Sequence, residues 1–303
     1  HIGPSDKDQS KMLQYVGSKS LVDFMSNPVP EKILLQDELK IDPPMSENDA
    51  LKKLKSISKK NKIFKNFIGM GYYNSITPNV ILRNILENPG WYTSYTPYQP
   101  EVAQGRLEML LNFQQSIIDL TGMDIANASL LDEATATAEA VGLSQRLDKT
   151  DSKKIFISSN CNPQTIDLIK TRTNPFGLEL IIGDEKKELT KISEDIICGI
   201  LSYPGTLGEI FDPSESISQI HKRNGRAILV CDLLALARLK TPAELGADIA
   251  VGSAQRFGIP MGYGGPHAAF FATKEEFKRS MPGRIIGVSK DKYGKKAYRL
   301  SLQ

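Results

Sequence analysis

The chain reads Ala227-Ile-Leu-Val-Cys-Asp232, then Pro242-Ala-Glu-Leu-Gly-Ala-Asp-Ile-Ala-Val-Gly-Ser-Ala-Gln-Arg-Phe-Gly-Ile-Pro-Met-Gly-Tyr-Gly-Gly-Pro-His267, and then Ala268-Ala-Phe-Phe-Ala272. The first run predicts an apolar strand that ends in a single carboxylate. A Pro-initiated turn, a second strand, a glycine-rich loop and a third strand are expected to follow. α/β enzymes place such polar residues at the carboxyl ends of their strands, where they form the floor of a ligand site.

This stretch resembles the P-proteins of the glycine cleavage system, the glycine dehydrogenases (decarboxylating). In related pyridoxal-phosphate enzymes, a strand-end Asp pairs with the pyridine nitrogen and a Lys after the next strand forms the Schiff base. The lysine of the C-terminal half of P-proteins lies in the pattern His-Lys-Thr-Phe-x-x-Pro-x-Gly-Gly-Gly-Gly-Pro. Residues 254–266 match it without a gap, and Gln255 stands at the lysine position. Because an amide cannot form an imine, the chain resembles the N-terminal half of the family.

The resemblance covers essentially the whole chain and implies its fold and function. The implied fold is an α/β large domain of the aspartate aminotransferase-like, fold type I transferases, with a mostly parallel sheet. Together with a lysine-bearing C-terminal half or second subunit, the implied activity is decarboxylation of glycine in glycine catabolism. The aminomethyl group then passes to the lipoyl arm of H-protein. Pyridoxal phosphate is expected in the partner half, and the isolated chain is expected to be inactive.

The composition excludes several other classes of protein. A formal charge of +3 and a pI near 8.6 are too mild for a nucleic-acid partner. No apolar run approaches the ~18 residues of a membrane span, and the N-terminus is too polar for a signal peptide. With three histidines, a His-based metal site or a Ser-His-Asp triad is not expected. Three widely spaced cysteines predict buried, reduced thiols in the cytoplasm, or in the mitochondrial matrix of a eukaryote.

The ends of the chain suggest a fragment. It starts on His1 rather than Met and stops within an apparently apolar strand near Gln303, without a terminating turn. We therefore expect the small C-terminal subdomain to be truncated. Residues 1–92 are expected to form a helical arm and an extended aromatic loop, and residues 93–303 the large domain. Serines at 5, 20 and 46 predict the starts of three short arm helices.

An aromatic stretch gives the candidate catalytic residues. Between 67 and 101 the density of Pro, Gly and Tyr predicts a structured loop rather than a regular helix or central strand. Tyr95, Tyr98, Gln99 and Glu101 match the family's loop that approaches the substrate pocket, and this match implies a catalytic role. Phenol donors can hold a small carboxylate while the rings exclude water.

Further along, strands and helices alternate, which predicts a mostly parallel sheet covered by helices on both faces. The expected elements are helix 101–120, a helix from 132, strand 154–158, helix 165–171, strands 178–182 and 196–202, and helix 213–222.

The turn before the second of these helices lacks the features of a phosphate site. Cofactor-binding members of the fold present a glycine- or serine-rich helix N-terminus to the phosphate. Here Asp132 and Glu133 occupy that end, where they cap the helix and would repel a phosphate. The family has Gly at the position of Ala134, and this departure affects only the geometry of the turn.

Three further residues of the opening stretch are polar, and each has its own interpretation. Asp232 either caps the following turn or is a relic of the pyridine-pairing Asp. His267 is expected to be packed at the start of a strand, and Arg256 to be a structural ion-pair partner.

Two other functions stay open at this point. The chain could be an independently active pyridoxal-phosphate enzyme of another specificity that uses Lys240 or Lys274. It could also be a nucleotide-binding module built on Gly262-Tyr-Gly-Gly265.

Overall fold

The computed structural model describes residues 2–35, 37, 39–93 and 96–302, and it divides the chain into two units. The first unit is 1–65 and the second is 66–303. Residues 66–92 therefore group with the second unit, whereas the predicted domain limits, 1–92 and 93–303, stay a prediction.

The first unit is a set of short amphipathic helices. They are α1 Asp6–Val16, α2 Leu21–Ser26 and α3 Glu47–Ser58. Ser5, Ser20 and Ser46 accept a hydrogen bond from the backbone N–H three residues later, so the predicted N-caps are confirmed. No residue of these three helices is buried.

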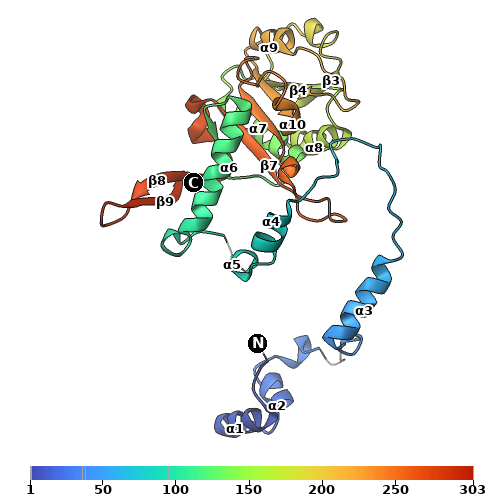
Figure 1. The fold of residues 1–303 in the computed structure, drawn as a ribbon, viewed down its shortest axis with the longest axis vertical. Coiled ribbons are helices and arrows are strands. Elements are labelled where there is room, and N and C mark those ends of the chain that lie inside the picture. The colour runs from blue at the N-terminus through green and yellow to red at the C-terminus, as the bar shows by residue number, and fades with distance from the viewer. Residues whose placement is uncertain (1, 36, 38, 94–95, 303) are drawn as a thin grey trace. The chain divides into compact units, whose positions relative to one another are not determined.

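The second unit contains a seven-stranded sheet in the order β1-β7-β6-β5-β4-β2-β3. Figure 1 shows part of this sheet, with β3, β4 and β7 labelled. The strands are β1 Ile125–Ala126, β2 Lys154–Ser158, β3 Glu179–Gly183, β4 Cys198–Tyr203, β5 Arg226–Cys231, β6 Ile249–Ser253 and β7 Ala269–Thr273. From β3 to β6 all neighbours are parallel, whereas β7 and β1 pair antiparallel. The predicted mostly parallel sheet is confirmed.

Helices cover both faces of this sheet. They are α6 Gln104–Thr121, α7 Glu133–Leu147, α8 Pro163–Thr173, α9 Ser214–His221 and α10 Leu233–Leu236. Successive strand residues point to opposite faces, so Leu229 packs in the core under α6, α9 and α10, and Ile228 in the core under α7 and α8. Strand β4 is buried along its whole length, as expected for a central parallel strand.

The aromatic stretch differs in part from the prediction. Residues 72–78 contain no helix or strand, as expected, but short turns follow: α4 Asn79–Ile81, a π-turn at 82–86, and α5 Pro89–Tyr92. Asn88 caps α5 by accepting from the N–H of Gly90, and Pro89 stands at the first helical position, where proline is tolerated. Similarly, Pro100 opens a separate 3₁₀ turn, so α6 begins at Gln104 rather than at the predicted Glu101.

A second, two-stranded sheet packs on α6. It consists of β8 Ile285–Lys290 and β9 Lys296–Leu302, paired antiparallel. Gln104 and Gln114 of α6 each bond both backbone groups of one strand residue, Tyr298 and Ile286 respectively. The strand predicted to be unfinished near the end of the chain is thus paired along one edge, because it forms a hairpin with β8, a strand that the sequence analysis missed.

All three cysteines are buried and free, as predicted. Burial raises the pKa of the Cys198 thiol to about 12. In the described part of the chain, no helix is long and apolar enough to cross a membrane.

Candidate functional site

A small cavity lies at the carboxyl edge of the parallel strands, within the second unit. Its volume is about 100 Å³. The residues that line it are Gly71, Tyr73, Ser75, Glu133, Asn162, Ser202, Pro204, Gly205, Gly208, Val230, Cys231, Asp232, Ser253, Gln255 and Arg256. Ser202, Cys231 and Ser253 lie at the carboxyl ends of β4, β5 and β6, so the sheet itself positions this part of the cavity lining.

Asp232 and Arg256 both line the cavity, where they form an ion pair. The Arg256 Nε donates to Asp232 Oδ1 at 3.0 Å, and its Nη2 donates to Oδ2 at 2.8 Å. Asp232 also caps α10 by accepting from the N–H of Leu234. Of the two interpretations of Asp232, capping is confirmed, and the predicted structural role of Arg256 as an ion-pair partner is confirmed as well.

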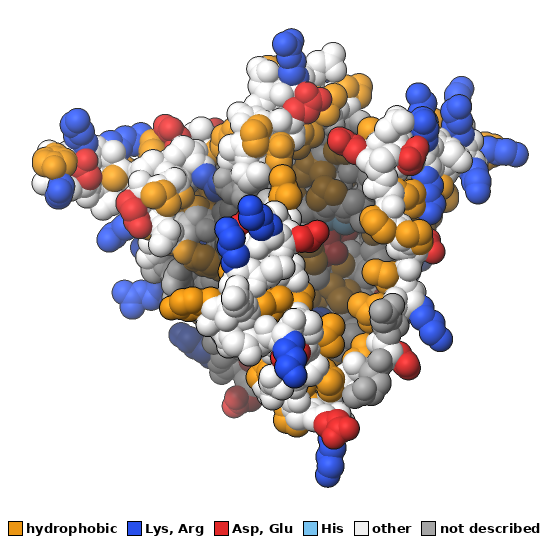
Figure 2. Space-filling model, turned by 90° about the horizontal axis from the view of Figure 1, so that it is seen from below, with side chains coloured by type: hydrophobic (Ala, Val, Ile, Leu, Met, Phe, Trp, Pro, Cys, Tyr) orange, Lys and Arg blue, Asp and Glu red, His pale blue; other side chains and the backbone are white. Residues whose placement is uncertain are grey.

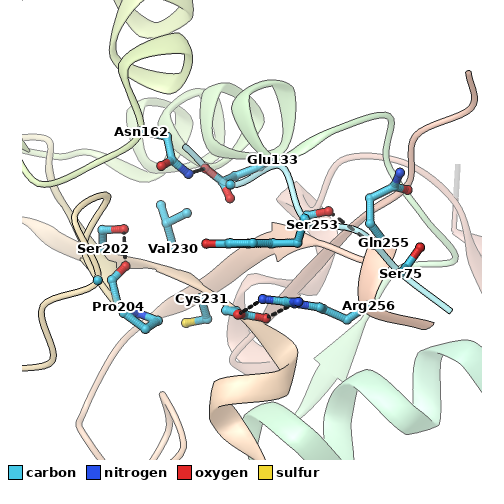
Figure 3. A pocket seen from close by; sticks show the side chains of 15 residues that line it. Ser75, Glu133, Asn162, Ser202, Pro204, Val230, Cys231, Ser253, Gln255 and Arg256 are labelled. Carbon is cyan, nitrogen blue, oxygen red and sulfur yellow. Dashed lines mark hydrogen bonds and ion pairs between the residues drawn. The ribbon is translucent and has the colours of Figure 1, made fainter. Parts of the chain in front are cut away.

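Glu133 and Asn162 lie across the cavity from Arg256 (Figure 3). Glu133 Oε1 accepts from Asn162 Nδ2 at 2.9 Å and from Thr165 Oγ1 at 3.0 Å. Burial raises the pKa of the Glu133 carboxyl, although these two hydrogen bonds act to lower it. The helix cap is therefore Asp132 alone, which forms a capping box with Thr135, and the prediction that Glu133 also caps the helix is wrong.

Gln255 is the first residue of a 3₁₀ turn after β6 and lines the cavity. Its backbone N–H donates to Ser253 Oγ at 3.2 Å, and its amide Nε2 donates to Pro266 O at 3.4 Å. Its Oε1 is buried without a hydrogen-bond partner. Next to it, His267 packs edge-on against Tyr72 with ring centroids 6.1 Å apart, in line with the prediction of a packed histidine.

The cavity does not fit pyridoxal phosphate. Among the described residues that line it there is no lysine, and Asp232 is already paired with Arg256. The N-terminus of α7 is capped by a carboxylate, and the volume is below the ~300 Å³ typical of small-molecule pockets. The described residues also contain no group of three or more His, Cys, Asp or Glu side chains that could hold a metal ion.

The described residues among those predicted to be catalytic, Tyr98, Gln99 and Glu101, do not line this cavity. Tyr98 and Gln99 line another one, of about 690 Å³, together with Trp91 and Arg106. The Tyr98 hydroxyl accepts a hydrogen bond from Arg284 Nη2 at 2.5 Å. Glu101 is exposed in the 3₁₀ turn and is not part of the lining. Tyr95 lies outside the described residues.

Sequence reasoning did not single out Tyr73, Asn162 or Ser253 for the strand-end cavity. Asn162 and Ser253 each follow or end a strand, and that placement is the signal that could have identified them. Tyr73 had no comparable signal, because it lies 183 residues from Arg256, the side chain it contacts.

The geometry also argues against both alternative functions. Lys274 follows β7, whose last residue pairs with the first residue of β6, so it lies at the amino edge of the sheet, where it pairs with Asp248. Lys240 does not line the strand-end cavity. The loop 262–265 leads into β7 rather than into a helix N-terminus, which a phosphate-binding glycine loop requires.

Comparisons with known proteins point to one family. The family model of the glycine cleavage system P-protein matches residues 1–303. The chain is 74% identical over its whole length to a glycine dehydrogenase (decarboxylating) of Pelagibacter ubique, and 55% identical to one of a Nostoc species. It spans about a third of the length of these relatives, 32% and 31%.

Among solved structures, a glycine decarboxylase (P-protein) of the glycine cleavage system in inhibitor-bound form matches with a TM-score of 0.90 and 32% identity. The match covers 99% of this chain and 69% of the solved P-protein chain. A sphingosine-1-phosphate lyase of Burkholderia pseudomallei, at 12% identity and a TM-score of 0.58, shares the fold alone. The predicted α/β transferase-like fold is thereby confirmed, and the chain belongs to the glycine cleavage system P-protein family.

Proposed function

We propose that this chain is the N-terminal half of a glycine decarboxylase. With the lysine-bearing half, it takes part in the pyridoxal-phosphate-dependent decarboxylation of glycine and in the transfer of the aminomethyl group to the lipoyl arm of H-protein. The observation that carries this proposal is Gln255, which stands at the lysine position on the wall of a strand-end cavity. The cofactor is then bound in the partner half, where it supplies the electron sink for the reaction.

The difference in length between the relatives supports a division into halves. This chain covers 69% of the solved P-protein chain but only 32% of the relative from Pelagibacter. A P-protein chain much shorter than the curated relatives therefore exists. The lysine-bearing half is accordingly either a continuation of the same polypeptide or a separate subunit.

In this proposal, the aromatic loop acts on the substrate. Tyr95, Tyr98, Gln99 and Glu101 approach the glycine in the assembled enzyme. Tyr98 and Gln99 share a cavity wall with Arg106, whose positive charge favours a small carboxylate. Arg284 holds the Tyr98 hydroxyl, which limits the freedom of the ring. We place the protein in the cytoplasm, or in the mitochondrial matrix of a eukaryote, in keeping with its buried free cysteines.

Borohydride trapping in the assembled enzyme tests the proposal. The complete protein is mixed with pyridoxal phosphate, reduced with borohydride and mapped by peptide mass spectrometry, and glycine–CO2 exchange is measured with and without lipoylated H-protein. We expect the pyridoxyl label on a lysine outside residues 1–303, and exchange that depends on H-protein. A label on one specific lysine within 1–303, or no exchange at all, would contradict the proposal.

A further inference from the structure

The guanidinium of Arg256 is enclosed between a carboxylate and an aromatic ring. It forms the two-pronged ion pair with Asp232, and its central carbon lies 3.9 Å from the centroid of the Tyr73 ring. Only 24% of the Arg256 side chain and 19% of the Asp232 side chain are exposed. A planar cation stacked on a ring and paired through two parallel hydrogen bonds matches arginine, whereas a lysine ammonium cannot make both contacts.

Tyr73 belongs to a segment that has few other ties to the sheet. Residues 72–78 form no helix or strand. Three side-chain hydrogen bonds and the contact of the Tyr72 ring with His267 tie residues 70–77 to the rest of the unit. Gln164 Nε2 donates to Met70 O at 2.6 Å, Ser75 Oγ to Ile259 O at 2.6 Å, and Thr77 Oγ1 to Gly258 O at 2.5 Å.

The same segment closes the strand-end cavity. Gly71, Tyr73 and Ser75 all line it, alongside Asp232 and Arg256. Gly71 lies close to the opposite wall, since a Cβ there would be 2.6 Å from Asn162 Nδ2. Of these contacts, the stack on Arg256 is the one that joins the segment to the carboxylate at the end of β5.

We propose that Asp232 and Tyr73 form a binding subsite for a planar cation, that Arg256 fills this subsite from within the chain, and that this closes residues 71–77 over the cavity. Shortening Arg256 leaves a subsite that accepts a free alkylguanidinium ion. The carboxylate of Asp232 is thus unavailable to any outside ligand while Arg256 is in place. This inference concerns the chain's own residues and holds or fails independently of the proposed function.

Limited proteolysis by subtilisin, with cleavage sites mapped by mass spectrometry on the full chain, tests it. In Arg256→Ala, cleavage within residues 71–77 should be at least about tenfold faster than in the wild type, because loss of the stack opens the segment locally. Adding ethylguanidinium should restore slow cleavage, whereas ethylammonium at the same concentration should not. Arg226→Ala is the matched control, because Arg226 also lies over a ring, that of Phe277, but has no link to this segment.

Each outcome decides the proposal. Wild-type cleavage of residues 71–77 in Arg256→Ala overturns it, and so does equal rescue by ethylammonium, which would indicate a general charge effect. If Arg256→Ala does not fold, Arg256→Lys and Tyr73→Leu replace it. Arg256→Lys keeps a positive charge beside Asp232 but not the planar group, and Tyr73→Leu keeps the ion pair but not the ring, so both should speed cleavage of the segment. Wild-type cleavage in both variants overturns the proposal as well.

Discussion

Asp248 is the most densely bonded carboxylate at the amino edge of the sheet. It is buried and accepts from His221 Nε2 at 2.8 Å, from the backbone N–H of Ala227 at 2.8 Å, and from Lys274 Nζ. Removing its charge leaves Lys274 without its ion-pair partner and weakens the hydrogen bond between the carboxylate and His221. We expect Asp248→Asn to lower the free energy of unfolding by about 2–4 kcal/mol, since His221 and Lys274 stay partly exposed. Urea unfolding monitored by circular dichroism measures this change.

The same contacts set the pH dependence of this contribution. Burial acts to raise the pKa of Asp248, but the hydrogen bonds from His221, Lys274 and Ala227 outweigh it and lower the pKa. Because the folded-state pKa lies below the unfolded-state pKa of about 3.9, the ionised carboxylate stabilises the fold at every pH above that value. This contribution is lost as the pH falls through the folded-state pKa. The loss caused by Asp248→Asn should therefore be full at pH 7 and shrink in acid. Asp167→Asn, which breaks an exposed pair with Lys170, is the control and should cost under about 0.5 kcal/mol. Equal losses in the two variants would contradict the argument.

Two tyrosines, Tyr95 and Tyr98, are proposed to act on the substrate, and Tyr98 is the one that the structure describes. Its ring lies 5.0 Å from the Arg284 guanidinium, which also donates to its hydroxyl. Tyr98→Phe removes the hydroxyl and keeps the ring, so the lost hydrogen bond should cost about 0.5–3 kcal/mol in glycine–CO2 exchange, a reduction of about 2- to 150-fold in kcat/KM. Tyr293→Phe, at an exposed hairpin turn, serves as the control. If the two variants have the same rate, the loop is only a scaffold.

At the scale of elements, β6 has almost no free space beside β5 and β7. Gly252 pairs with Phe270 of β7, and a Cβ at Gly252 would overlap the carbonyl oxygen of Cys231 and approach the Phe270 ring to 2.8 Å. Backbone cannot yield as a flexible side chain does, so Gly252→Ala should cost about 2 kcal/mol or more in unfolding free energy. The matched control is Gly105→Ala in α6, where a Cβ meets nothing within 4 Å. That change should be neutral or stabilising by up to about 1 kcal/mol, and thermal unfolding of both variants measures the contrast.

The elements of the sheet were predictable because their signals are local. Apolar runs bounded by turns gave β2 and β5 to within a residue, and the Asp132 cap gave the start of α7. The β8–β9 hairpin was missed for two reasons. Exposed residues alternate with half-buried ones in the second part of β8, and the groups that anchor the hairpin, such as Gln114, are polar side chains of a helix far away in the sequence. In the site, Gln255 was identified from the family pattern. The stack of Arg256 on Tyr73 joins residues 183 apart, and no local pattern encodes it.

For the molecule as a whole, apolar side chains are exposed over an unusual extent. Figure 2 shows hydrophobic side chains across much of the face turned to the viewer. In the first unit, the apolar face of α3 is exposed, with Leu51 at 61%, Leu54 at 64% and Ile57 at 49%. In the second unit, Phe67, Ile76 and Leu86 are at least half exposed. Soluble monomers rarely expose apolar surface on this scale, so we expect a partner to cover it.

The isolated chain should therefore self-associate, and co-expression with the remainder of the longer P-proteins should yield a soluble complex. Sedimentation velocity over a concentration series measures this, and a monomer at every concentration would contradict the half-enzyme proposal. To locate the surface, Leu51, Leu54 and Ile57 are replaced together by Gln, and in a second variant Lys52, Lys55 and Lys59 are replaced by Gln. Because only the first variant removes apolar area from α3, it alone should weaken association if the arm contributes. Equal association in both variants would indicate that the chain self-associates through the second unit. The exposed apolar residues that the structure describes between 67 and 102 would then be the next to replace.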